Sequence, residues 1–158
     1  QIAAAIGANV YVTSSSDEKI ERAKQLGAVG GINYRRDGWH KKLLEEVGQF
    51  QLVVDGVGGE NLNHLISLTA PGGRIVSYGT TSGVVPEFNV ARMFIKNVDL
   101  LGTALGSPRE FARMLDLFEQ HQIRPVIDRC FPLEATVEAL KYMAKGGNFG
   151  KITVKISD

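Results

Sequence analysis

The sequence has one cysteine, no long hydrophobic run and almost no net charge. A single cysteine, Cys130, excludes an internal disulfide and favours a reducing compartment, so we expect a cytoplasmic protein. No apolar run approaches the roughly 18 residues that cross a bilayer, so no membrane partner is expected. The formal net charge of +1 gives no support for a nucleic acid as a partner either.

Metal ligands and activated nucleophiles are also sparse. His40, His64, His121 and Cys130 are widely spaced and form no ligand motif, so we expect no metal site in this chain. No G-x-S-x-G motif is present to support nucleophilic catalysis. The basic run at 34–36 is followed by acidic residues and is interpreted as a solvated face.

What the 158 residues do contain is the composition of a globular domain, with 44% hydrophobic and 22% charged residues. Apolar periodicity and turn residues predict strands that alternate with helices. Strands or extended segments are expected at 9–13, 28–34, 51–54, 74–78, 97–104, 125–131 and 151–156. Helices are expected at 18–26, 39–47, 61–68, 108–120 and 133–144, with a turn at 71–73. Several strands are apolar on both faces, which predicts an α/β fold with a doubly wound, mostly parallel sheet covered on both sides.

Small, polar or glycine residues follow nearly every predicted strand. They are Thr13 to Ser16, Tyr34, Asp55 to Gly59, Gly79 to Gly83 and Thr103 to Gly106. Ligands of doubly wound sheets lie beyond the carboxyl ends of the strands, and glycine lets a ligand approach the backbone closely. Any one of these segments could be an ordinary turn, but together they predict a nucleotide-binding cleft.

The end of the strand at 9–13 carries hydroxyl groups where many NAD-binding folds carry an acidic residue. That acidic side chain accepts hydrogen bonds from the ribose 2′-hydroxyl, whereas a 2′-phosphate requires donors and a cation. Here Ser14 and Ser15 follow the strand, Lys19 lies one turn into the next helix, and Tyr34 could add a donor. The negative charge of Asp17 argues against a phosphate, but this residue lies too far beyond the strand end for the usual ribose contact. This arrangement favours NADPH over NADH, the alternative being that the serines only cap a helix and that Lys19 is a surface residue.

Five segments resemble the medium-chain dehydrogenase/reductase superfamily in their order along the chain. They read SSSDEKIERAKQLGAVGGINYRRDGW, VVDGVGG, PGGRIVSYGTTSG, DLLGTALGS and GGNFGKITV. The resemblance is greatest to members that are like quinone oxidoreductases and zinc-type alcohol dehydrogenases. It implies a Rossmann-type domain and hydride transfer between NAD(P)H and a small alcohol, aldehyde, ketone, quinone or enone.

The resemblance also implies roles for individual positions. Cofactor contacts fall on Ser14, Ser15, Lys19 and Tyr34 around the adenosine 2′-phosphate, on Val57 and Gly58 in the cleft, on Gly79 and Thr80 near the nicotinamide ribose, on Thr103, Ala104 and Leu105 beside the nicotinamide, and on Lys151 near the pyrophosphate. For Lys151, a surface position on a last strand is the alternative. The strand around Leu100–Ala104 would pair with its copy in a homodimer.

Two departures from the superfamily pattern set further expectations. The glycine-rich fingerprint and the strand before it are not in the sequence, and Gln1 begins inside the helix that should follow them. We therefore expect a fragment that neither folds stably nor is active alone. Residues 1–121 would be a partial cofactor domain, and 122–158 would return toward a catalytic domain, leaving their apolar side chains exposed. Catalytic residues and any zinc ligands would lie in that domain. A non-catalytic member of the superfamily, or another nucleotide-binding fold, remains the alternative.

Overall fold

A computed structural model of the protein describes residues 1–157. Every strand pairing in it is parallel, as the sequence predicted, but the strands form three sheets. The first sheet joins β1 (Tyr11–Ser14) to β2 (Gly30–Asn33). The second has the order β3 (Phe50–Asp55), β4 (Thr69–Ser77) and β5 (Asp99–Gly102), and the third joins β6 (Ile127–Pro132) to β7 (Lys151–Lys155).

Residues 1–157 form seven α-helices, some of which begin at a residue whose side chain accepts a free N–H group of the helix. They are α1 (Ile2–Ala5), α2 (Asp17–Gln25), α3 (Trp39–Val47), α4 (Asn61–Leu68), α5 (Val90–Lys96), α6 (Pro108–Gln120) and α7 (Thr136–Ala144), the last preceded by a 3-10 turn at Leu133–Ala135. Ser16 caps α2 by accepting the Lys19 N–H at 3.4 Å. Ser107 and Glu110 form a reciprocal capping box at the start of α6. No helix among residues 1–157 is long and apolar enough to cross a membrane.

Helix α4 links the first two sheets through two hydrophobic clusters. Leu68 packs with Ile32, Trp39 and Leu43, from β2 and α3. Leu62 and Ile66, on the same helix, pack with Ile75 of β4 and with Val98, which immediately precedes β5. Ile66 and Ile75 are almost completely buried, and each such side chain contributes about 1.5–3 kcal/mol relative to exposure. The contacts of α4 therefore hold β1–β2 and β3–β4–β5 in one body.

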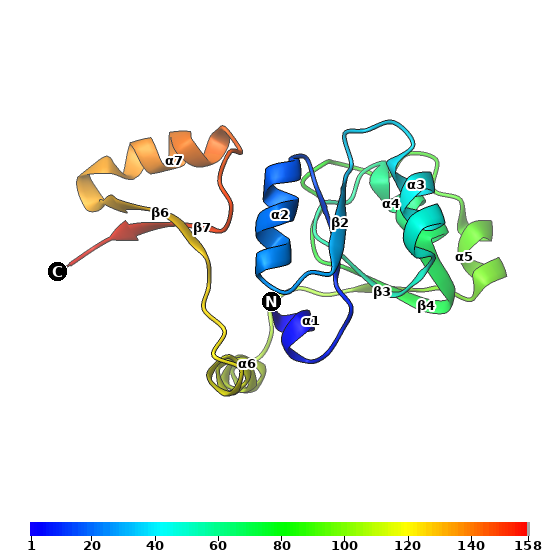
Figure 1. Cartoon of the computed structure of the whole chain (residues 1–158), viewed down its shortest axis with the longest axis horizontal. Coiled ribbons are helices and arrows are strands. Elements are labelled where there is room, and N and C mark those ends of the chain that lie inside the picture. The colour runs from blue at the N-terminus through cyan, green and yellow to red at the C-terminus, as the bar shows by residue number, and fades with distance from the viewer. Residues whose placement is uncertain (158) are drawn as a thin grey trace.

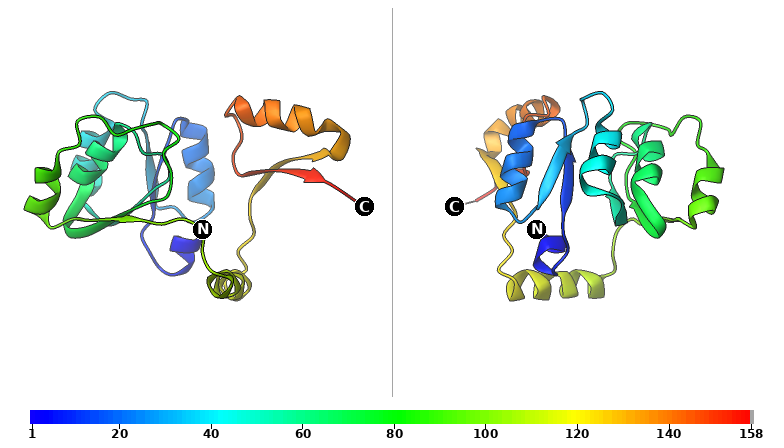
Figure 2. Two further views of the ribbon diagram at one scale, coloured as in Figure 1. Left: turned by 180° about the vertical axis from the view of Figure 1, so that it is seen from behind. Right: turned by 45° about the vertical axis from the view of Figure 1, so that its right-hand side comes forward.

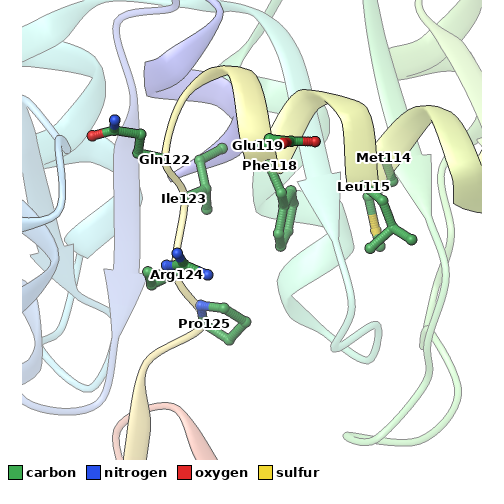
Figure 3. Close-up of a pocket in the computed structure, with 8 residues that line it drawn as sticks. All are labelled: Met114, Leu115, Phe118, Glu119, Gln122, Ile123, Arg124 and Pro125. Carbon is green, nitrogen blue, oxygen red and sulfur yellow. The ribbon is translucent and has the colours of Figure 1, made fainter.

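Among residues 1–157, no strand pairs β1 to β3, and one face of β3 is open. Leu52 and Val54 are 55% and 64% exposed. The prediction of a sheet covered on both faces is therefore wrong for β3, because α6 lies away from it (Figure 2). The apolar side chains Met114, Leu115 and Phe118 of α6 instead line an open hollow with the segment 122–125 (Figure 3).

The region before β5 also differs from the sequence prediction. A strand was expected over 97–104, but α5 runs to Lys96, Asn97 follows in the left-handed conformation at φ 52°, and β5 spans only Asp99–Gly102. Strand β4 begins at Thr69 and includes the predicted turn at 71–73 as a shift in register against β3. Local sequence gave little sign of α5, because none of its side chains is buried.

The C-terminal elements β6, α7 and β7 form a unit of their own, joined to the rest through α6 (Figure 1). Ile127 is 59% exposed, as expected for 122–158. The expectation is wrong for Phe131, which is buried and contacts Tyr142 and Arg129. Arg22 of α2 stacks on the Phe149 ring at 4.3 Å and so ties the unit to the first sheet.

Candidate functional site

The carboxyl ends of neighbouring strands are aligned by their register. Ser14 is paired with Asn33 at the ends of β1 and β2, and Asp55, Ser77 and Gly102 are aligned across β3, β4 and β5. In both sheets the pairing continues one residue past the strand end. Tyr34 donates its N–H to the Ser14 carbonyl, and Tyr78 donates its N–H to the Asp55 carbonyl, both at 3.0 Å. The predicted site segments therefore start next to one another in each sheet, as ligand loops of parallel sheets do.

The loops after β3 and β4 contact each other through their backbones. Ser82 donates its N–H to the Val57 carbonyl at 2.9 Å. A Cβ on Gly58, which has φ +66°, would lie 3.2 Å from the Gly79 oxygen and from the Thr80 Cα. A Cβ on Gly79 would collide with the Gly56 carbonyl. Glycine is therefore required at 58 and 79, and the structure brings together Val57, Gly58, Gly79 and Thr80.

The end of β1 carries a compact set of hydroxyl groups. The Ser14 Oγ accepts the Ser16 N–H at 3.3 Å, and Ser14 and Ser15 are both half-buried. Tyr34, after β2, is 40% exposed. Serine oxygens beside the start of α2 can accept or donate hydrogen bonds, and the partial positive charge of the helix N-terminus favours an anion there. This end of the site therefore combines hydroxyl groups with the N-terminus of a helix.

Lys19 lies one turn into α2 and reaches across to the C-terminal unit. Its Nζ donates to the Gly146 carbonyl at 2.9 Å, a contact between residues far apart in sequence. An ammonium group has three donors, so one contact leaves two available. The loop that carries Gly146 is fixed on both sides by Asp128. This carboxylate accepts hydrogen bonds from the Tyr142 hydroxyl, before the loop, at 2.8 Å and from the Phe149 N–H, after Gly146, at 3.0 Å. These hydrogen bonds hold the pKa of Asp128 below its usual value, the Phe149 contact having the largest effect.

The carboxylate of Asp17, which sequence reasoning set aside, is neutralised. Arg36 contacts it at 2.6 Å and Asn33 donates to it at 3.2 Å, both from the end of β2 and the loop after it. Arg36 was interpreted from sequence as part of a solvated face. Only the pairing of β1 with β2 shows that it faces Asp17, because the two residues are 19 positions apart.

The remaining predicted residues lie further out. Thr103, Ala104 and Leu105 follow the edge strand β5, and Leu105 is 99% exposed. Lys151 begins β7 and lines a hollow beside β1 with Val10 and Val12. Within residues 1–157 no three His, Cys, Asp or Glu side chains gather where they could hold a metal ion, so we derive no role for zinc in this chain.

The sequence prediction included Asp55 in a segment at a strand end but gave it no role of its own. Asp55 is only 5% exposed, and its carboxylate accepts the N–H groups of Val57 and Gly58. An aspartate immediately before a glycine-rich turn is a recognisable signal, because its side chain bonds backbone groups two and three residues on.

Comparison with known proteins agrees with this geometry. Residues 1–120 match the zinc-binding dehydrogenase family. A zinc-type alcohol dehydrogenase-like protein of Leptosphaeria maculans, YogA, is 40% identical over 96% of this chain and 45% of its own length. Quinone oxidoreductase-like protein 2 of Bos taurus is 29% identical over 94% of this chain and 46% of its own.

A solved structure of an NAD-dependent alcohol dehydrogenase superposes with a TM-score of 0.88 and 31% identity, over 96% of this chain and 45% of that one. The chain thus spans somewhat less than half the length of these relatives. Their names describe them as alcohol dehydrogenases, or as proteins similar to alcohol dehydrogenases or quinone oxidoreductases. From the family match and the aligned strand ends together, the chain belongs to the zinc-binding dehydrogenases of the medium-chain dehydrogenase/reductase superfamily.

Proposed function

We propose that this chain forms the NADPH-binding part of an oxidoreductase that transfers a hydride to or from a small carbonyl, alcohol, quinone or enone. The observation that carries the proposal is the end of β1, where Ser14 and Ser15 lie beside the start of the helix that bears Lys19, and where the Asp17 carboxylate is paired with Arg36. The nicotinamide supplies the hydride chemistry when bound, and the residues of this chain bind and orient it.

Electrostatics at the end of β1 support the 2′-phosphate. A carboxylate at position 14 would repel that group, whereas hydroxyls and an ammonium attract it. Asp17 is the nearest acidic residue in sequence, and its charge is balanced by Arg36 at 2.6 Å. Lys19 has donors left after its contact with Gly146. Relatives include an enzyme named as NAD-dependent, so the cofactor preference of this chain has to follow from its own side chains.

The close packing of the loops after β3 and β4 supports the position of the rest of the cofactor. Gly58 and Gly79 lack a Cβ, so the two loops pack backbone against backbone and bring Val57 close to Thr80, where we propose that the dinucleotide lies. Thr103, Ala104 and Leu105 would lie beside the nicotinamide and Lys151 near the pyrophosphate. We further propose that residues 1–121 serve the cofactor and 122–158 lead back toward a catalytic domain of a cytoplasmic enzyme.

The edge of the second sheet supports a homodimer. Strand β5 pairs with β4 on one side, and Leu100 and Leu101 are 37% and 43% exposed. An edge strand with apolar side chains is a template for pairing with a second chain. We propose that two copies of β5 pair and extend the sheet across a twofold axis.

The test is made on the whole native protein. Titration with NADPH, followed by the fluorescence of the nicotinamide, should show saturable binding at the expected stoichiometry of one per chain, tighter than for NADH. Turnover is then measured with a panel of quinones, aldehydes and enones. Binding without oxidation of NADPH by any of them would favour a non-catalytic nucleotide-binding member of the family, and absence of dinucleotide binding would refute the proposal.

A further inference from the structure

A buried carboxylate with backbone partners only lies at the end of β3. Asp55 is 5% exposed and, within residues 1–157, forms no ion pair. Its Oδ1 accepts the Val57 N–H at 3.0 Å, and the Gly58 N–H lies 3.1 Å from Oδ2 and 3.2 Å from Oδ1. Burial of a carboxylate is costly unless such hydrogen bonds compensate it, so these contacts fix the loop to the strand.

The loop held in this way has a backbone conformation that favours glycine. Gly58 and Gly59 have φ values of +66° and +64°, in the left-handed region that other residues rarely adopt, and both are buried. The main-chain oxygen of Asp55 also accepts the Tyr78 N–H at 3.0 Å, at the start of the loop after β4. One residue therefore connects the two loops, by its side chain to 57–58 and by its main chain to 78.

We propose that Asp55 is a positioning residue for the dinucleotide: its carboxylate holds the Val57–Gly58 turn against Gly79, so that the nicotinamide half of the cofactor meets a preformed backbone wall. The inference rests on the proposed function, since it takes these loops to line the cofactor cleft. Asp55 itself is too deeply buried to touch the cofactor, and it acts through the N–H groups that it orders.

Two substitutions separate this role from a general effect on folding. Asp55→Ala leaves both loop N–H groups without an acceptor, and Asp55→Asn restores an acceptor at one oxygen but places an amide donor toward Gly58. With hydrogen bonds to a charged acceptor lost, we expect Asp55→Ala to weaken NADPH binding by about 10- to 100-fold and Asp55→Asn by less. Binding of 2′,5′-ADP, which carries the adenosine half only, should change by less than about twofold, because Ser14 ends a strand of another sheet and Lys19 lies on the helix that follows that strand.

Thr69→Val is the matched control. Thr69 is fully buried at the opposite end of the same sheet, and its hydroxyl donates to the Leu65 carbonyl at 2.7 Å. It should lower the urea midpoint of the whole protein and leave NADPH affinity unchanged. Equal loss of NADPH and 2′,5′-ADP in Asp55→Ala, unchanged NADPH binding in it, or a matching loss in Thr69→Val would each overturn the inference. Failure of the unmodified protein to bind NADPH would instead refute the proposed function itself.

Discussion

Replacing Lys19 with alanine tests whether this side chain reads the 2′-phosphate. A hydrogen bond to a charged group contributes about 1.5–3 kcal/mol, and we take the lower limit because Lys19 is only half-buried and partly screened by water. About 1.4 kcal/mol corresponds to a tenfold change in the dissociation constant. Lys19→Ala should therefore weaken NADPH binding about tenfold and leave NADH binding nearly unchanged.

The assay is equilibrium titration of the whole native protein with each cofactor at fixed ionic strength. Lys24→Ala is the matched control, because Lys24 lies on the same helix and is paired with Glu21 at 2.7 Å. Added salt should reduce the difference between wild type and Lys19→Ala, since screening weakens an exposed ion contact. Equal weakening of NADPH and NADH would show that Lys19 acts only through its bond to Gly146 and does not read the phosphate.

Three further predictions concern stability and assembly. The His40 and His64 rings stack with their centroids 3.9 Å apart, and burial, followed by the charges of His64 and Lys41, lowers the pKa of His40. The stability that this stack contributes is therefore complete above about pH 6.5 and falls as the pH drops through that value. Urea unfolding between pH 8 and pH 5 should show this loss of stability, and the loss should be smaller in His64→Gln but unchanged in His121→Gln. Leu101→Asp should shift the native protein from dimer to monomer in sedimentation, whereas Val137→Asp, at an exposed position of α7, should not; an unchanged mass would contradict pairing through β5. The polypeptide 1–158 expressed by itself should show no cooperative thermal unfolding, because no strand of residues 1–157 pairs with the edges of β1 and β3 that lie opposite β2 and β4, and Leu52 and Val54 are exposed. A sharp monomeric transition would refute this.

The strand ends were the most predictable part of the site. Helices α3, α4 and α6 were predicted with the bounds that the structure shows, and the predicted polar and glycine segments lie at or just after the ends of the observed strands. These signals are local, because a few neighbouring residues determine where a strand ends and where a helix is capped. Gly58 and Gly79 were recognised for the same reason, although the close contact between their loops became visible only in the structure.

Contacts between distant segments were not predictable from one sequence. The bond from Lys19 to Gly146 joins residues 127 positions apart, and the burial of Phe131 depends on how β6 packs against α7. The exposure of one face of β3 was not predictable for a similar reason. An apolar strand predicts burial on both faces, whether or not another element covers it in the structure. Helix α5 was missed because it is short and none of its side chains is fully buried, so its sequence has only a weak amphipathic pattern.

The most direct test of the account is a charge placed at the end of β1. Ser14→Asp puts a carboxylate where NAD-binding folds use one for the ribose 2′-hydroxyl, and Ser14→Ala controls for loss of the serine oxygen. Dissociation constants of NADPH and NADH are measured for the whole native protein and both variants. We predict that Ser14→Asp binds NADPH at least about tenfold more weakly while NADH binding is kept or improved, so that the cofactor preference reverses. An unchanged ratio of the two constants in Ser14→Asp would contradict the claim that the 2′-phosphate lies at the end of β1.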